Sequence, residues 1–249
     1  MNIIGDVGAQ YGLAFNWSKL EAMPVRCNVI LPTPQGGTVK LKEGIVYLGS
    51  LLSNDGSIGG ELGRRIGNAS CDFRVLCKVW SHAAINKQRK LEIFNACVVS
   101  KLMCCIHTAW LNVAERRRLD AFQNKCLRKV MGVKHSFYSR VTNQSILQQA
   151  GSQKLSVILL KRQLQLLHHI ALKPEGDILR NSVFQPNTFA VREPTGPKPR
   201  GRPRNTWAKE VLKHAISAAG GQQALAQLWH ASKATWRNTI KIYCDSVDF

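Results

Sequence analysis

The first 56 residues show the alternation of apolar and polar positions that is typical of strands. Residues 12–16 fit one half-buried strand and residues 22–31 a second. After a turn rich in proline and glycine, residues 38–41 and 45–48 are expected to pair as a hairpin. This part of the chain is therefore predicted to be β-rich, with too few strands to close a core by itself.

The period of the pattern changes at Ser57, just after a turn predicted at Asn54-Asp55-Gly56. From there apolar residues recur at spacings of three and four, which places them on one face of a helix. The members of this face are Ile58, Leu62, Ile66, Ala69, Phe73, Leu76 and Trp80. Because Arg64 and Arg65 fall between them, the helix is expected to be both amphipathic and basic.

More helices follow, each with its own boundary signals. Residues 87–109 are apolar nearly all round, which predicts a buried, central helix. The next helix is expected to begin after an Asn112 cap and to end at Gly132. Its inward residues should be Leu119, Phe122, Cys126, Leu127 and Val130. Residues 142–149 predict a short helix and residues 154–172 a longer one.

Residues 186–205 differ in kind, because proline, glycine and basic residues are mixed there without an apolar period. This composition predicts an extended linker. Beyond it, residues 206–219 and 222–243 are expected to be two helices joined at Gly220-Gly221. Three tryptophans should anchor them, namely Trp207, Trp229 and Trp236.

These patterns divide the chain into four predicted parts. They are a β-hairpin part at residues 1–56, a helical bundle at residues 57–185, the linker at residues 186–205 and a helical segment at residues 206–249. The fold class that follows is α+β, mostly α.

The 249 residues carry a formal net charge of +20, and this charge is unevenly placed. Residues 1–56 are neutral, with four Lys or Arg and four Asp or Glu. Residues 57–150 hold 16 against five, and residues 151–249 hold 15 against six. Such a basic balance indicates RNA, DNA or an RNA–DNA hybrid as partner, with an anionic membrane surface as the next candidate. No apolar run reaches the roughly 18 residues of a membrane span, and we expect no membrane partner.

Motifs that bind a metal or a cofactor do not stand out. No Cys-x-x-Cys pair occurs, and the neighbours Cys104-Cys105 and His168-His169 would point about 100° apart on a helix. No Walker loop, dinucleotide fingerprint or nucleophile elbow is present, so we expect no cofactor and no catalytic residue. The eight cysteines indicate reduced thiols and, without a secretory leader pattern, an intracellular location, nuclear or cytoplasmic.

Four segments share their residues and their order with one known family. The first is Gly-Leu-x-x-Asn-x-x-Lys at residues 12–19, with Leu20 where the family has Thr. The others are, in order, Tyr47-Leu48-Gly49-Ser50 with Asp55-Gly56, the basic helical series at residues 61–66, 90–94 and 117–128, and Gly-Arg-Pro-Arg-Asn-Thr-Trp at residues 201–207. Together they resemble the end of the palm, the thumb and the tail of a non-LTR (LINE-type) retrotransposon reverse transcriptase.

The resemblance implies an RNA-directed DNA polymerase, whose chemistry needs two Mg²⁺ ions held by aspartates that include an adjacent Asp-Asp pair. This sequence contains no Asp-Asp pair, and only Asp6 precedes the Gly-Leu segment. We therefore expect a nucleic-acid-binding fragment that does not polymerise by itself, with the missing upstream part of the polymerase as a further partner. Lys19 occupies the position of a family lysine that protonates pyrophosphate; the alternative is a surface lysine at a strand end.

The resemblance also implies that Tyr47 and Gly49 position a primer backbone, the alternative being an ordinary hairpin core. Arg64 and Arg65 on the first predicted helix are further candidates for phosphate contact. The densest basic patch comprises Arg116, Arg117, Arg118, Lys125, Arg128 and Lys129. On a helix, three of these share one stripe and so can meet several phosphates from one side, namely Arg118, Lys125 and Lys129. The alternative is a solvated face with Glu115 and Asp120 as partners.

A second nucleic-acid motif lies in the predicted linker. Arg200, Arg202 and Arg204 belong to Pro-Arg-Gly-Arg-Pro-Arg, which resembles an AT-hook, an extended segment that lies in a narrow A·T minor groove. A linker that contacts phosphates without reading bases is the alternative. Two other functions stay open, an AT-hook-like minor-groove DNA-binding protein and a basic helical scaffold for acidic proteins.

Overall fold

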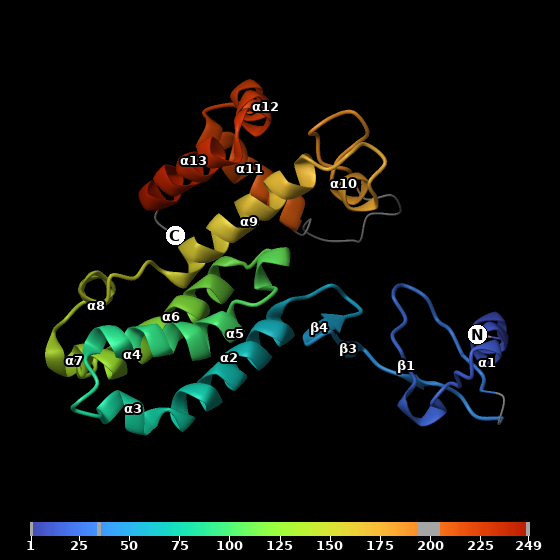
Figure 1. Ribbon diagram of the computed structural model, residues 1–249, viewed down its shortest axis with the longest axis horizontal. Helices are drawn as coiled ribbons and strands as arrows, with labels where there is room; N and C mark the ends of the chain where they lie inside the picture. The colour runs from blue at the N-terminus through green and yellow to red at the C-terminus, as the bar shows by residue number, and fades with distance from the viewer. Residues whose placement is uncertain (1, 34–35, 194–204, 248–249) are drawn as a thin grey trace. The chain divides into compact units, whose positions relative to one another are not determined.

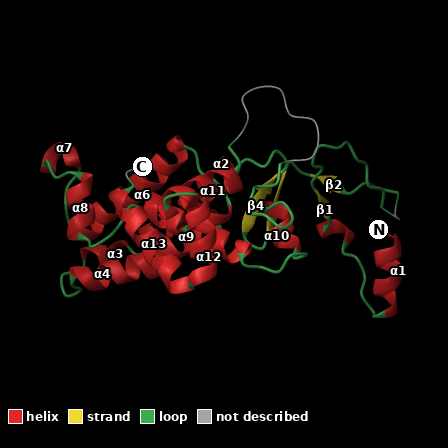
Figure 2. Cartoon of the chain, turned by 90° about the horizontal axis from the view of Figure 1, so that it is seen from above, coloured by secondary structure: helices red, strands yellow, loops and turns green. Residues whose placement is uncertain are grey.

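The computed structural model describes residues 2–33, 36–193 and 205–247, and these residues are mostly helical with two small sheets (Figures 1 and 2). The predicted fold class, α+β and mostly α, is therefore confirmed. The chain forms two compact units, Met1–Gly63 and Arg64–Phe249.

The first unit begins with a helix that the sequence pattern did not predict, α1 at Asn2–Gln10. Residues 12–16 are not a strand as expected, because Gly12 takes a φ of +72° and turns the chain after α1. A single turn of 3₁₀ helix, η1, follows at Trp17–Lys19. The predicted strand at 22–31 is reduced to β1, Glu21–Ala22, which pairs in parallel with β2, Lys40–Leu41.

A hairpin closes this unit, but its pairing differs from the prediction. Strand β3, Gly44–Tyr47, pairs with the strand after it, β4, Ser50–Ser53, and not with residues 38–41. The reason is the two-residue turn at Leu48 and Gly49, whose φ values of +47° and +81° match the twist of a tight hairpin. The turn predicted at residues 54–56 is confirmed, since the Gly56 amide donates to the Ser53 carbonyl at 3.0 Å.

The helical series starts as predicted and is then interrupted. Helix α2 spans Gly59–Val75 and α3 spans Cys77–Ser81, with a break at Leu76. The predicted inward face is buried at Leu62, Ala69 and Trp80. The indole of Trp80 stacks on Phe73 with ring centroids 5.0 Å apart, which joins the two helices across the break.

The helix expected at 87–109 is present but ends early. It runs through α4 (Lys87–Phe94), the π-helical turn η2 (Asn95–Val99) and α5 (Ser100–Leu102). Cys105 then takes a φ of +59°, which an α-helix does not tolerate. The chain continues as a short 3₁₀ helix, η3, at Ile106–Thr108.

The next helices agree closely with the prediction. Helix α6, Val113–Met131, begins at a capping box of Asn112 and Glu115 and ends at Gly132, which has a φ of +72°. All five of its predicted inward residues are buried. After the short α7 (Ser136–Ser139) come α8 (Asn143–Gln149) and α9 (Leu155–Ala171).

The C-terminal helices pack against α9 within the same unit (Figure 1). They are α10 (Ile178–Val183), α11 (Trp207–Ala219), α12 (Gln222–Ala231) and α13 (Lys233–Ser246). The prediction of a single helix at 222–243 is wrong, because the Ser232 side chain caps a new helix by accepting from the Thr235 amide at 3.0 Å. Trp229 and Trp236 anchor a shared core with Leu164 and Leu167 of α9.

Candidate nucleic-acid interface

The hairpin places both of its predicted contact residues at the surface. Tyr47 ends β3 with its side chain 63% exposed, so it is not the core residue of the alternative interpretation. Gly49 follows in the turn, and its φ of +81° is a backbone conformation that glycine adopts without strain. The tip of this hairpin therefore presents backbone and the side chains of Tyr47 and Leu48 to the solvent.

Arg65 of α2 has a structural role. The residue is only 8% exposed, and its guanidinium donates from Nη1 to the Lys101 carbonyl at 3.0 Å, near the end of α5. Because helix C-termini leave carbonyls without intrahelical donors, this bond caps α5 and joins it to α2. Arg65 is therefore withdrawn from the predicted contact residues. Arg64, one position earlier, is partly buried.

The stripe predicted on α6 is present and exposed. Arg118, Lys125 and Lys129 all lie at the surface, as does Arg117 beside them. Spacings of seven and four residues return to nearly the same side of a helix, so the three charges share one face. At about 1.5 Å per residue they span about 16 Å along the helix axis, or about five steps along one nucleic-acid strand. We call Arg118, Lys125 and Lys129 the α6 stripe.

Two other arginines of α6 point away from this stripe. Arg128 is 7% exposed and donates to the carbonyls of Lys134 (3.2 Å) and Val141 (2.7 Å) and to Oδ1 of Asn143 (2.9 Å). Arg128 is therefore not among the exposed cations of α6, because its donors hold the loop after the helix.

Arg116 is half-buried, with its guanidinium carbon 4.7 Å from the centre of the Trp110 ring. Burial lowers the pKa of its guanidinium, and the nearby carboxylates of Glu210 and Asp120 act in the opposite direction. A cation that stacks on a tryptophan and lies near two carboxylates is a poor phosphate ligand, so Arg116 is also withdrawn.

The two carboxylates near the start of α6 bond elsewhere and leave the stripe uncompensated. Glu115 accepts from the Asn112 amide at 2.8 Å. Asp120 accepts from the amide and the hydroxyl of Ser156 at 2.9 and 2.6 Å. The hydrogen bonds of these two acids therefore go to Asn112 and Ser156 and not to the three residues of the α6 stripe.

The sequence that contains most of the stripe and continues beyond it has basic residues but no acidic ones. No Asp or Glu occurs between Asp120 and Glu175, whereas nine Lys or Arg do. They are Lys125, Arg128, Lys129, Lys134, Arg140, Lys154, Lys161, Arg162 and Lys173. This run also contains the exposed aromatic pair Phe137 and Tyr138, which the hydrophobic pattern did not single out. Their position amid basic residues without acids was the available signal.

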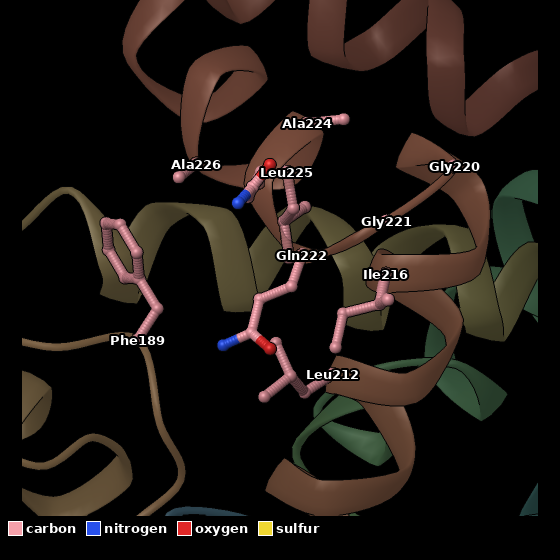
Figure 3. Close-up of a pocket in the computed structure, with 10 residues that line it drawn as sticks. Phe189, Leu212, Ile216, Gly220, Gly221, Gln222, Ala224, Leu225 and Ala226 are labelled. Atoms are coloured by element: carbon pink, nitrogen blue, oxygen red, sulfur yellow. The ribbon is translucent and has the colours of Figure 1, made fainter.

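A hollow of about 750 Å³ opens between Phe189 and the Gly220-Gly221 junction of α11 and α12 (Figure 3). Where the structure describes it, the hollow is lined by apolar side chains, two glycines and two glutamines. Since none of these groups ionises near neutral pH, the lining offers no acid–base chemistry.

Other kinds of site are equally unsupported in the described residues. Within ranges 2–33, 36–193 and 205–247, no three His, Cys, Asp or Glu side chains gather as metal ligands would. No helix of the described chain combines the length and the apolar character that crossing a membrane requires. Arg200, Arg202 and Arg204 lie outside the described residues, as does most of the predicted linker.

Comparison of the chain with models of known families, with curated proteins and with solved structures found no match. The likeness to LINE-type reverse transcriptases therefore depends on the four sequence segments described above.

Proposed function

We propose that the chain binds nucleic acid through the exposed face of α6, as a fragment of a LINE-type reverse transcriptase that does not polymerise by itself. The observation that carries the proposal is the α6 stripe, three exposed cations on one face whose neighbouring carboxylates bond elsewhere. Contacts of this kind are made to phosphates and not to base edges, so binding should tolerate sequence in RNA, DNA or a hybrid.

The hairpin and the lack of an Asp-Asp pair support the second part of the proposal, that the chain is a fragment of this family that does not polymerise by itself. Tyr47 and Gly49 are exposed where the family would contact a primer backbone. The sequence has no Asp-Asp pair, and Asp6 is the one acidic residue before the Gly-Leu segment at residue 12, whereas a two-metal reaction needs several carboxylates there. Holding a strand is therefore the function that the chain's own residues support.

A salt titration tests the proposal. If six to ten phosphates are engaged, the logarithm of the binding constant for a duplex should fall with the logarithm of salt concentration at a slope of about −5 to −9. Replacing two stripe residues, Lys125→Gln and Lys129→Gln, should make that slope shallower by about 2 and weaken RNA and DNA alike. Fluorescence anisotropy across a salt series measures both quantities.

The matched control is Lys213→Gln. Lys213 is exposed on α11, and its ammonium already pairs with Glu210 at 2.9 Å. Its loss lowers the net charge without removing a stripe cation, so the slope should be unchanged. A flat salt dependence of the unmodified protein, or an equal effect of the control and the stripe variant, would contradict the proposal.

A further inference from the structure

The loop between α6 and α8 presents two adjacent aromatic rings to the solvent. Phe137 and Tyr138 of α7 are 67% and 74% exposed. Their rings meet edge to face, with centroids 5.3 Å apart, so the ring faces point in different directions. Two large neighbouring rings with this exposure contribute little to the protein's own core and are available to a partner.

Positive charge surrounds the pair. The Arg140 guanidinium lies 5.6 Å from the centre of the Phe137 ring, and Lys134 is exposed just before α7. The loop belongs to the run of sequence without Asp or Glu. Rings combined with cations are how proteins hold unpaired nucleotides, because bases stack on the rings while the cations meet the phosphates. A duplex keeps its base faces stacked inside the helix and so gains little from the rings.

Hydrogen bonds from Arg128 and to His135 hold the loop in place. Buried Arg128 bonds to the carbonyls of Lys134 and Val141, one on each side of the aromatic pair. The Phe137 amide also donates to Nδ1 of His135 at 3.3 Å. Since these contacts fix the loop before any partner arrives, little conformational entropy is lost on binding.

We propose that Phe137 and Tyr138 form a stacking platform for unpaired bases, which continues the strand whose phosphates meet the α6 stripe. The inference rests on the proposed function and adds to it a preference for single strands. Lys129, the last residue of the stripe, is the direct neighbour of the arginine that holds the loop, so stripe and platform are joined through α6. Stacking reads no base identity, and the platform therefore selects unpaired from paired nucleic acid.

Three labelled probes of equal length separate stacking from charge: a mixed-sequence single strand, its duplex and an oligomer of abasic nucleotides. The full chain is compared with a double variant, Phe137→Leu and Tyr138→Leu, that keeps apolar bulk and removes both rings. Affinity for the single strand should fall about a hundredfold, because each of the two lost base–ring stacks contributes about a factor of ten. Affinity for the duplex and the abasic oligomer, measured by anisotropy, should be unchanged.

Two controls accompany the variant. Exchanging the rings, Phe137→Tyr with Tyr138→Phe, should preserve single-strand affinity. Ile178→Ala, which truncates an 89% exposed side chain on α10, should change no affinity. Circular dichroism of each variant should match the unmodified protein, since substitutions at exposed positions rarely disturb folding.

The outcomes distinguish the platform from the proposed function. Salt-sensitive binding of all three probes, with single-strand affinity unaffected by the leucine variant, overturns the platform and leaves nucleic-acid binding intact. An equal loss on the abasic oligomer also overturns it. Self-association that the leucine variant abolishes, without a change in affinity, would assign the rings to a second copy of the chain. No binding of any probe by the unmodified protein would overturn both proposals.

Discussion

Arg128 and Lys129 are neighbours with the same charge and opposite surroundings. Arg128 is buried under the loop after α6, and Lys129 lies at the surface in the α6 stripe. A helix turns by about 100° per residue, so adjacent side chains leave it in different directions. The planar guanidinium also suits Arg128, because its fan of donors reaches two carbonyls and an amide oxygen at once.

Removing the side chain of Arg128 should destabilise the helical unit. Arg128→Ala removes a buried side chain and its three part-buried hydrogen bonds to Lys134, Val141 and Asn143, and we expect a loss of about 3 kcal/mol in the free energy of unfolding. Urea denaturation followed by circular dichroism measures it. Lys129→Ala is the control and should change stability by less than about 0.5 kcal/mol. A similar loss in both variants would mean that the bonds of Arg128 contribute little.

The sequence pattern located the α6 stripe but not which arginines around it are buried. The stripe follows from spacings of seven and four, which any regular helix converts into one face. Whether Arg116 and Arg128 are exposed depends on partners outside α6, in irregular segments of the chain. These partners include the Trp110 ring and the Val141 carbonyl. Periodicity carries no information about such partners, so both arginines were grouped with exposed ones.

Helix boundaries were predictable wherever a local signal marked them. Asn112 and Gly132 bound α6, and Thr142 caps α8 by accepting from the Ser145 amide at 3.1 Å. The errors share another cause. Strand β3 pairs with the strand directly after it because Leu48 and Gly49 form a tight turn. The helix predicted at 222–243 is two helices because Ser232 caps the second one, and an apolar period does not reveal such a cap. Local turn chemistry decided both cases.

The capping box of α6 should have a measurable effect on stability. In Asn112→Ala the Glu115 amide loses its side-chain acceptor, now at 2.9 Å, and unfolding should become easier by about 1 kcal/mol. Thermal and urea unfolding both report the change. Glu115→Gln is the matched control, since an amide oxygen can still accept from the Asn112 amide, and it should cost less than the alanine variant. The reverse order would contradict the capping assignment.

The first unit, Met1–Gly63, has a formal net charge of −1 and the second, Arg64–Phe249, has +21. The excess charge begins after residue 56, close to the division between the units at Gly63 and Arg64. Three features therefore change within a few residues of one another. They are the net charge, the spacing of apolar residues and the compact unit to which the chain belongs. The union of the C-terminal helices with α9 in one core was not predictable, because pairing between distant helices leaves no local trace in the sequence.

The arginines of the predicted linker allow a test of how the whole chain selects DNA. If Arg202 contacts only phosphate, Arg202→Ala should weaken binding equally for A·T-rich and G·C-rich duplexes and make the salt slope shallower by about 1. Competition between the two duplexes measures the preference. An A·T preference that disappears in the variant would instead favour the AT-hook-like alternative.

The packing of α13 on α9 has a consequence for how the chain is made. The Trp236 indole donates to the Leu164 carbonyl at 3.4 Å across 72 residues of sequence. On a ribosome, which adds residues from the N-terminus at roughly 5–20 per second, α9 emerges several seconds before its partner. During that interval its apolar face lacks its native cover, so the core of the second unit closes late in synthesis. A nascent chain halted before Trp236 would expose Leu164 and Leu167 to chaperones or to aggregation.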